Sequence, residues 1–209
     1  MNRTLLLASL AVIALVACRP KVPPLRGDVA PARIPAAQLP SHHQKVVFRW
    51  TYADRNFRAR GEGVARVSPP DSVRLDFFLD RGMGGGSAHL IGNDLRAPND
   101  RMVRSVLPPV PLLWAALGRL SIGTPPDTVA RLAGDTLRVE VGRGSTWRVT
   151  FVRDSLSELM HVKGGRIQQF VQRDSARVRF RDPGASRDLQ LTIVRVDTVP
   201  GGFDASIWR

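Results

Sequence analysis

The stretch Val73-Arg74-Leu75-Asp76-Phe77-Phe78-Leu79-Asp80 decides the fold class of this chain. Apolar side chains occupy every second position, and mostly charged residues stand between them. Successive side chains of a β-strand point to opposite faces, so the pattern predicts a strand with one buried and one wet face. Antiparallel sheets commonly bury a single face, and the stretch therefore favours an antiparallel sheet.

The same alternation recurs from His43 onward. It is clearest over residues 137–141, 147–151 and 189–193, and stretches such as Gly142-Arg143-Gly144-Ser145 between them have turn chemistry. We count roughly ten to twelve strand candidates of this kind. The prediction is a mainly β domain, built on one curved antiparallel sheet.

One segment breaks the alternation and predicts a helix. After the prolines at positions 108, 109 and 111, the residues Leu113, Trp114 and Leu117 recur at helical spacing before Gly118. A second short helix is expected over Pro126 to Leu132. Both helices are expected to close over the sheet.

The N-terminus has the features of an export signal. Arg3 precedes an apolar stretch, Leu5 to Val16, that is too short to span a bilayer. The run Leu15-Val16-Ala17-Cys18 that ends it resembles the bacterial lipobox. The resemblance implies cleavage before Cys18 and acylation of its thiol, and no cofactor is expected besides this covalent lipid. The alternative is an ordinary secretory signal that happens to end in a cysteine.

These features divide the chain into three parts. Residues 1–17 are the expected lipoprotein signal peptide, residues 18–42 a proline-rich tether, and residues 43–209 the folded domain. Prolines at the density found after Cys18 favour extended, poorly packed chain. Because Cys18 is the only cysteine, the domain must be stable without disulfides.

The formal net charge of +13 would ordinarily indicate nucleic-acid binding. The export signal argues against a nucleic-acid partner, because the protein leaves the compartment where nucleic acid is found. All but three of the 31 basic residues are arginine, and they are scattered along the chain. A solvated basic surface is one interpretation, and attraction to anionic lipid headgroups is the other.

Motifs for catalysis and metal binding are lacking in the sequence. His42 and His43 are adjacent and point in different directions, while His89 and His161 stand alone, so no metal-ligand spacing occurs. No serine lies in a Gly-x-Ser-x-Gly motif, and the only thiol is expected to carry lipid. We therefore expect neither an enzyme nor a metal site.

Several short motifs resemble, in order, those of the LolA/LolB superfamily of bacterial lipoprotein carriers and outer-membrane receptors. They are Arg60-Gly61-Glu62-Gly63-Val64, Pro70 to Leu75, the glycine-bearing loop Asp80 to Gly85, Pro111 to Gly118, Ser145 to Thr150 and Leu189 to Ile193. The resemblance covers roughly residues 43–199. The order of these motifs carries more weight than any single residue.

The resemblance implies an incomplete antiparallel β-barrel, a half-barrel of about eleven strands roofed by short helices, whose apolar interior binds acyl chains. Leu117 and two tryptophans are candidates for lining that cavity, although tryptophans at such positions are more often simple packing. The alternating apolar residues face either the core or the cavity. The candidates are Leu75, Phe77, Leu79, Trp114, Leu117, Leu137, Val139, Trp147 and Val149.

The resemblance also implies a place and partners in the cell envelope. Met83 occupies the loop from which the family's receptor projects an apolar residue toward the membrane, but it equally fits a loose hairpin turn. Arg19 differs from the aspartate that commonly retains lipoproteins at the inner membrane, so the periplasmic face of the outer membrane is favoured. The expected partners are the membrane, acyl chains of lipoproteins or lipids, and a periplasmic LolA-like carrier. The alternative function is a structural or scaffolding lipoprotein, which a filled interior would support.

Overall fold

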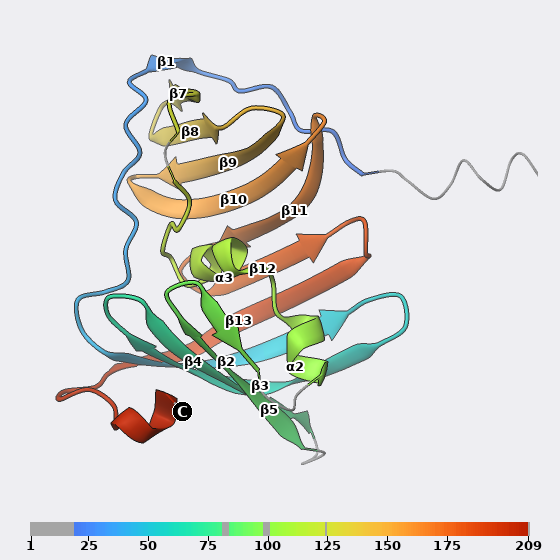
Figure 1. The fold of residues 1–209 in the computed structure, drawn as a ribbon, viewed down its shortest axis with the longest axis vertical. Coiled ribbons are helices and arrows are strands. Elements are labelled where there is room, and N and C mark those ends of the chain that lie inside the picture. Colours follow the sequence, from blue (N-terminus) through green and yellow to red (C-terminus); the bar gives the residue numbers. More distant parts are fainter. Residues whose placement is uncertain (1–18, 81–83, 98–100, 124, 209) are drawn as a thin grey trace, which may run out of the picture.

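A computed structural model describes residues 19–80, 84–97, 101–123 and 125–208 (Figure 1). Its main feature is one sheet of 13 strands in which all neighbours pair antiparallel. The strands are β1 (Asp28–Ala30), β2 (Gln44–Ala53), β3 (Arg58–Ser68), β4 (Ser72–Leu79), β5 (Gly85–Ile91), β6 (Asp94–Arg96), β7 (Thr128–Ala133), β8 (Thr136–Val141), β9 (Ser145–Val152), β10 (Ser155–Lys163), β11 (Arg166–Arg173), β12 (Arg177–Asp182) and β13 (Arg187–Thr198).

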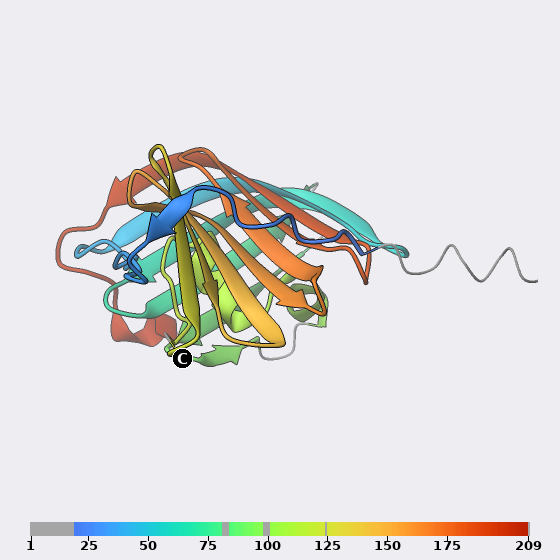
Figure 2. The same cartoon turned by 90° about the horizontal axis from the view of Figure 1, so that it is seen from above.

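The sheet is curved but not closed, which confirms the predicted half-barrel (Figure 2). The strand order is β1-β7-β8-β9-β10-β11-β12-β13-β2-β3-β4-β5-β6, so β13 joins the two halves of the chain by pairing with β2. The sheet has more strands than the expected eleven because three-residue strands, β1 and β6, extend its two edges.

Two short helices lie on the inner face of the sheet (Figure 1). The predicted helix is present as α3 (Val110–Ala116), with proline in its first turn and Gly118 just beyond it at φ +92°. The helix α2 (Arg101–Val106) was not expected. The helix expected over Pro126 to Leu132 is wrong, because residues 128–133 form β7, which pairs with both β8 and β1.

Two glycines of β3 let other groups approach its backbone closely. A Cβ atom on Gly61 would lie 1.8 Å from the carbonyl oxygen of Phe78 in β4. A Cβ atom on Gly63 would lie 2.4 Å from the ring of Phe48. The Phe48 ring therefore packs directly over Gly63 and meets Phe77 edge to face at 5.7 Å. This explains physically why the stretch Arg60 to Val64 carries glycine at these positions.

The N-terminal segment packs along the sheet, unlike the poorly packed tether expected for this part of the chain. The amide of Ile167 donates to the carbonyl of Pro20 at 2.9 Å, and the amide of Val22 donates to the carbonyl of Gly165 at 3.0 Å. Further on, β1 pairs with β7, and Leu39 is buried in the core. Without β1, the strand β7 would be an edge strand with unpaired backbone groups, and its pairing with β1 satisfies some of these groups.

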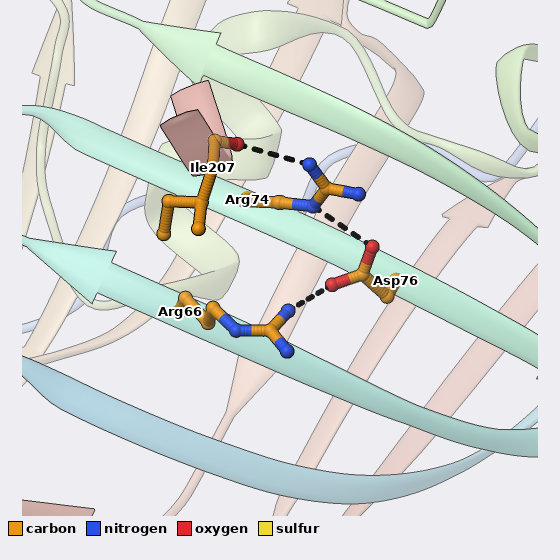
Figure 3. Close-up of polar contacts among 4 residues, drawn as sticks. All are labelled: Arg66, Arg74, Asp76 and Ile207. Carbon is orange, nitrogen blue, oxygen red and sulfur yellow. Dashed lines mark hydrogen bonds and ion pairs between the residues drawn. The ribbon is translucent and has the colours of Figure 1, made fainter. Parts of the chain in front are cut away.

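The C-terminal segment covers part of the outer face of the sheet. Its short 3-10 helix η2 (Ala205–Trp208) lies beside β4, where the guanidinium of Arg74 donates to the carbonyl of Ile207 at 3.0 Å (Figure 3). Arg74 also pairs with Asp76 at 2.9 Å, and Arg66 of β3 pairs with the other carboxylate oxygen. Asp76 is 8% exposed, so the two arginines offset the cost of burying its charge.

Candidate functional site

The nine predicted cavity-lining residues all belong to one apolar cluster on the inner face of the sheet. Leu75 and Phe77 of β4, Val139 of β8, Val149 of β9 and Trp114 of α3 are at most 5% exposed. The other four, which are partly buried and packed against this core, are Leu79, Leu117, Leu137 and Trp147. The sequence pattern thus identified one contiguous surface, and its role in lining a cavity stays a prediction.

The interior of the half-barrel is filled by α3. The side chains of Leu112, Leu113, Trp114 and Ala115 are buried, and α3 lies over β10, β11 and β12. The void left beneath it measures about 40 Å³ and is bounded mostly by apolar side chains, among them Leu75 and Phe77. One water molecule occupies about 30 Å³ of liquid, so this void cannot hold an acyl chain while α3 stays in place.

Few polar contacts hold α3 in the interior. The indole of Trp114 donates to the carbonyl of Gly92 at 2.8 Å, and the guanidinium of Arg119 lies 4.6 Å from the centre of the same ring system. Gly118 ends the helix, and a Cβ atom there would lie 3.1 Å from the guanidinium of Arg173. Burial lowers the pKa of Arg173, whose guanidinium also donates to the carbonyl of Leu156 at 3.3 Å. The remaining contacts of the helix are largely apolar.

Sequence reasoning missed part of this interior. Phe48, Trp50 and Tyr52 of β2 alternate with Arg49 and Thr51, and each of the three aromatic residues is at most 3% exposed. The same alternation rule that identified β4 would have found them. The void is also bounded by residues from α3, its preceding loop and the two strands β12 and β13: Leu107, Pro108, Leu113, Ala116, Val178, Phe180, Leu189 and Leu191.

A further hollow is an open groove of about 660 Å³ at the ends of β2, β3, β4 and β13. It is lined by Thr51 and Arg60, which lie opposite each other in the β2–β3 ladder and alternate with the inward-facing Tyr52 and Ala59. The groove therefore lies mainly on the outer face. Only Leu79 of the predicted lining residues borders it.

Burial perturbs three further titratable side chains, of which His161 packs against Trp147 with ring centres 4.8 Å apart. It lowers the pKa of His89, where Arg74 adds to the effect, and lowers the pKa of His161. It raises the pKa of Glu158, although Gln172 donates to this carboxylate at 2.7 Å. No three metal-ligating side chains gather within the described ranges. Glu158 and His161 belong to β10 and His89 belongs to β5, and no hydrogen bond or ion pair joins the three among the described residues.

Two predicted residues lie outside the described part of the chain, namely Cys18 and Met83. The loop that contains Met83 follows β4, and across this loop the amide of Leu79 donates to the carbonyl of Gly84 at 3.0 Å. Between residues 19 and 208, as far as these are described, no helix has the length and apolar character needed to cross a membrane.

A solved structure with a similar overall arrangement of strands and helices identifies the fold. A LolA superfamily protein from Nitrosomonas europaea superposes with a TM-score of 0.51 at 10% identity, over 83% of this chain and 92% of that one. The chain has the LolA-like fold. A second solved structure, of a putative outer membrane lipoprotein-sorting protein domain from Vibrio parahaemolyticus, has a TM-score of 0.49 at 5% identity. The match covers 80% of this chain and 90% of that one. No family model and no curated protein matches the sequence.

Proposed function

We propose that this protein is a lipid-anchored envelope protein whose LolA-like half-barrel binds acyl chains of lipoproteins or lipids. The anchor is a lipid on Cys18, and the location is the periplasmic face of the outer membrane. One observation carries the proposal: the interior is mainly apolar, and the helix that fills it is held mainly by apolar contacts that an acyl chain can replace. The role is binding and partition, with no catalysis.

The balance of burial favours such an exchange. Displacing α3 exposes three large apolar side chains, Leu112, Leu113 and Trp114, at a cost of about 8 kcal/mol in lost burial. An acyl chain of about sixteen carbons gains about 12 kcal/mol when it leaves water for the same surface. The gain from burying the acyl chain thus exceeds the loss from exposing the helix by about 4 kcal/mol, a margin that also has to cover the cost of ordering the bound acyl chain. The interior need not be empty beforehand. Because α3 has only seven residues, its removal leaves the sheet ladder intact.

The filled interior also favours a second candidate function. With a void of about 40 Å³, the half-barrel already has a packed core and could serve as a structural or scaffolding lipoprotein that holds a partner at the envelope. This function needs no displacement of α3. The two candidates therefore differ in whether the interior ever opens.

Mass spectrometry of bound lipid separates the two candidates. The unlipidated Cys18→Ala variant is purified, extracted and analysed, and its uptake of acyl chains from a loaded LolA-like carrier is measured. Carriage predicts extracted lipid or transfer in near-stoichiometric amounts. If the extract holds no lipid and no transfer occurs, the scaffolding function is the correct one.

Location and delivery have their own tests. The lipidated protein is expected in the outer-membrane fraction because Arg19 follows Cys18, and recovery in the inner membrane would overturn this assignment. If the loop of Met83 contacts the bilayer during delivery, Met83→Glu is expected to slow acyl transfer to vesicles without weakening acyl binding. Transfer at an unchanged rate would remove the loop from the mechanism.

A further inference from the structure

The antiparallel strand order brings four of the described turns to one end of the half-barrel, on the right in Figure 1. These turns are residues 54–57, 142–144, 164–165 and 183–186. The start of the described chain lies at the same end, where residues 20 and 22 hydrogen-bond to residues 167 and 165. Figure 2 shows this grouping of turns and N-terminal segment from a second direction.

This end carries a cluster of exposed cations, which we name the basic end. None of its members forms an ion pair with a carboxylate in the part of the chain that the structure describes. Three of them take part in the local hydrogen bonding. Arg55 donates to the carbonyl of Gly184, Arg166 donates to the carbonyl of Arg19, and Arg19 donates to the side chain of Gln168. The six residues of the basic end are Arg19, Lys21, Arg55, Arg58, Lys163 and Arg166.

The carboxylates near the basic end are already engaged. Asp54 accepts the amides of its own turn, which together with Tyr52 lower its pKa, and Asp182 is buried and accepts the amide of Ala185 at 3.0 Å. Asp80 pairs with Arg60 at 2.9 Å, and Asp127 pairs with Arg143 at 2.6 Å. The six cations outnumber Asp54 and Asp182, the two of these carboxylates that lack an ion-pair partner among the described residues, so the basic end keeps a net positive charge.

The turns at the opposite end of the sheet have the opposite character. They carry Asp71, Asp135, Asp154 and Asp174, of which Asp135 pairs with Arg153 at 3.1 Å. The high net positive charge is thus not evenly spread, because the turns of one end are basic and those of the other end bear aspartates. Such a separation orients a molecule in the field of a charged surface.

We propose that the basic end is a docking surface for the anionic headgroups of a lipid bilayer. The inference deepens the proposed function and rests on its lipid anchor at Cys18. Arg19, the residue after the anchor, is itself part of the basic end and contacts Gln168 of β11. The hydrogen bonds of Pro20 and Val22 hold the following residues against the β10–β11 turn. The domain therefore lies with its basic end on the bilayer, instead of standing away from it on a free tether.

The size of the effect follows from the membrane's surface potential. Each lysine or arginine close to an anionic surface adds about fivefold in affinity, and the effect falls off within a Debye length of about 10 Å. Removing three such cations therefore lowers binding by about a hundredfold. Cations at the opposite end are too far from the surface to matter as much.

The test is sedimentation of a soluble piece with lipid vesicles at low and physiological salt. Residues 19–209 contain every described strand and the whole core, so this piece keeps the sheet and lacks the anchor. It is compared on phosphatidylglycerol-containing and pure phosphatidylcholine vesicles. The tested variant replaces Lys21, Arg58 and Lys163 by glutamine, three side chains that make no hydrogen bond or ion pair with any residue that the structure describes.

A matched control variant replaces Arg33, Arg131 and Arg177 by glutamine, which removes the same charge away from the basic end. We expect salt-sensitive binding to the anionic vesicles only, a loss of about a hundredfold in the tested variant, and a few-fold loss at most in the control. Equal losses in both variants, equal binding to neutral vesicles, or binding to soluble polyglutamate but not to vesicles would each overturn the proposal.

Failure of the docking surface can be distinguished from failure of the proposed acyl binding. Uptake of a soluble fluorescent fatty acid by the same piece reports on the interior and involves no vesicle. A piece that takes up fatty acid but ignores anionic vesicles refutes the docking surface alone. A piece that binds vesicles but takes up no fatty acid refutes acyl binding alone.

Discussion

Leu113→Ala tests whether the helix α3 leaves the interior when an acyl chain enters. Leu113 is 4% exposed and borders the void beneath the helix. Truncating it removes buried apolar atoms from the closed state of the protein. In a state with α3 displaced, the same side chain is in water, and its truncation costs little. The substitution therefore shifts the balance toward the displaced state.

The magnitude follows from core truncations of this kind, which destabilise by about 3 kcal/mol. The closed state is expected to lose this amount in free energy of unfolding, because the site lies against an existing void and cannot collapse fully. Acyl affinity is expected to rise by up to about a hundredfold, since a ligand that binds only the displaced state gains whatever the closed state loses.

The assay combines urea unfolding with titration of a fluorescent long-chain fatty acid. The matched control is Leu90→Ala, because Leu90 is fully buried in β5, a strand that contacts α2. The control is expected to lose similar stability without gaining affinity. An affinity of Leu113→Ala that is unchanged or reduced relative to the original protein would refute displacement of α3.

Two further predictions concern polar groups of the sheet. Asp76→Asn is expected to destabilise the protein by about 2 kcal/mol, because it leaves two half-buried arginines without their carboxylate. The control Asp94→Asn removes an exposed ion pair and is expected to cost under about 1 kcal/mol. Equal losses of the two variants in urea unfolding would contradict this prediction. Folding lowers the pKa of His89 and of His161, so the unfolded chain binds more protons below about pH 6.5. The free energy of unfolding should therefore fall as pH falls through and below this value. The double variant His89→Gln/His161→Gln should show a weaker dependence of this free energy on pH. An unchanged pH profile of stability would show that neither histidine contributes. Glu158 does not mimic the histidine effect, because its raised pKa makes stability rise as pH falls.

The sheet could be predicted from sequence because its information is local and repeated. In β4, Val73, Leu75 and Phe77 are buried where the alternation placed them, and the proline-led helix at Leu113 and Trp114 is present as α3. These residues lie in elements whose burial pattern follows their own period. Their side-chain pattern alone is sufficient to indicate the element.

Other elements depend on partners that the sequence does not reveal. Residues 128–133 have no decisive period, and they form a strand because β8 and β1 offer hydrogen bonds on both sides. The stretch Asp28–Ala30 lies among prolines and becomes a strand only at the exposed edge of β7. The filled interior also could not be predicted from the sequence, because alternation identifies the inward face of a strand but does not show whether a helix packs on that face.

The pairing of β13 with β2 has a consequence for how the protein folds. Gln44 lies opposite Thr198, so this ladder closes a loop of nearly the whole domain, whereas every hairpin on either side closes locally. Non-local strand pairing forms late because loop entropy must first be overcome. Until the last strand is in place, β2 and β12 each present an unpaired edge, which is where chains associate wrongly. Loss of the C-terminal strand would therefore split the sheet into two separate ladders, remove Leu189 from the core and produce aggregation.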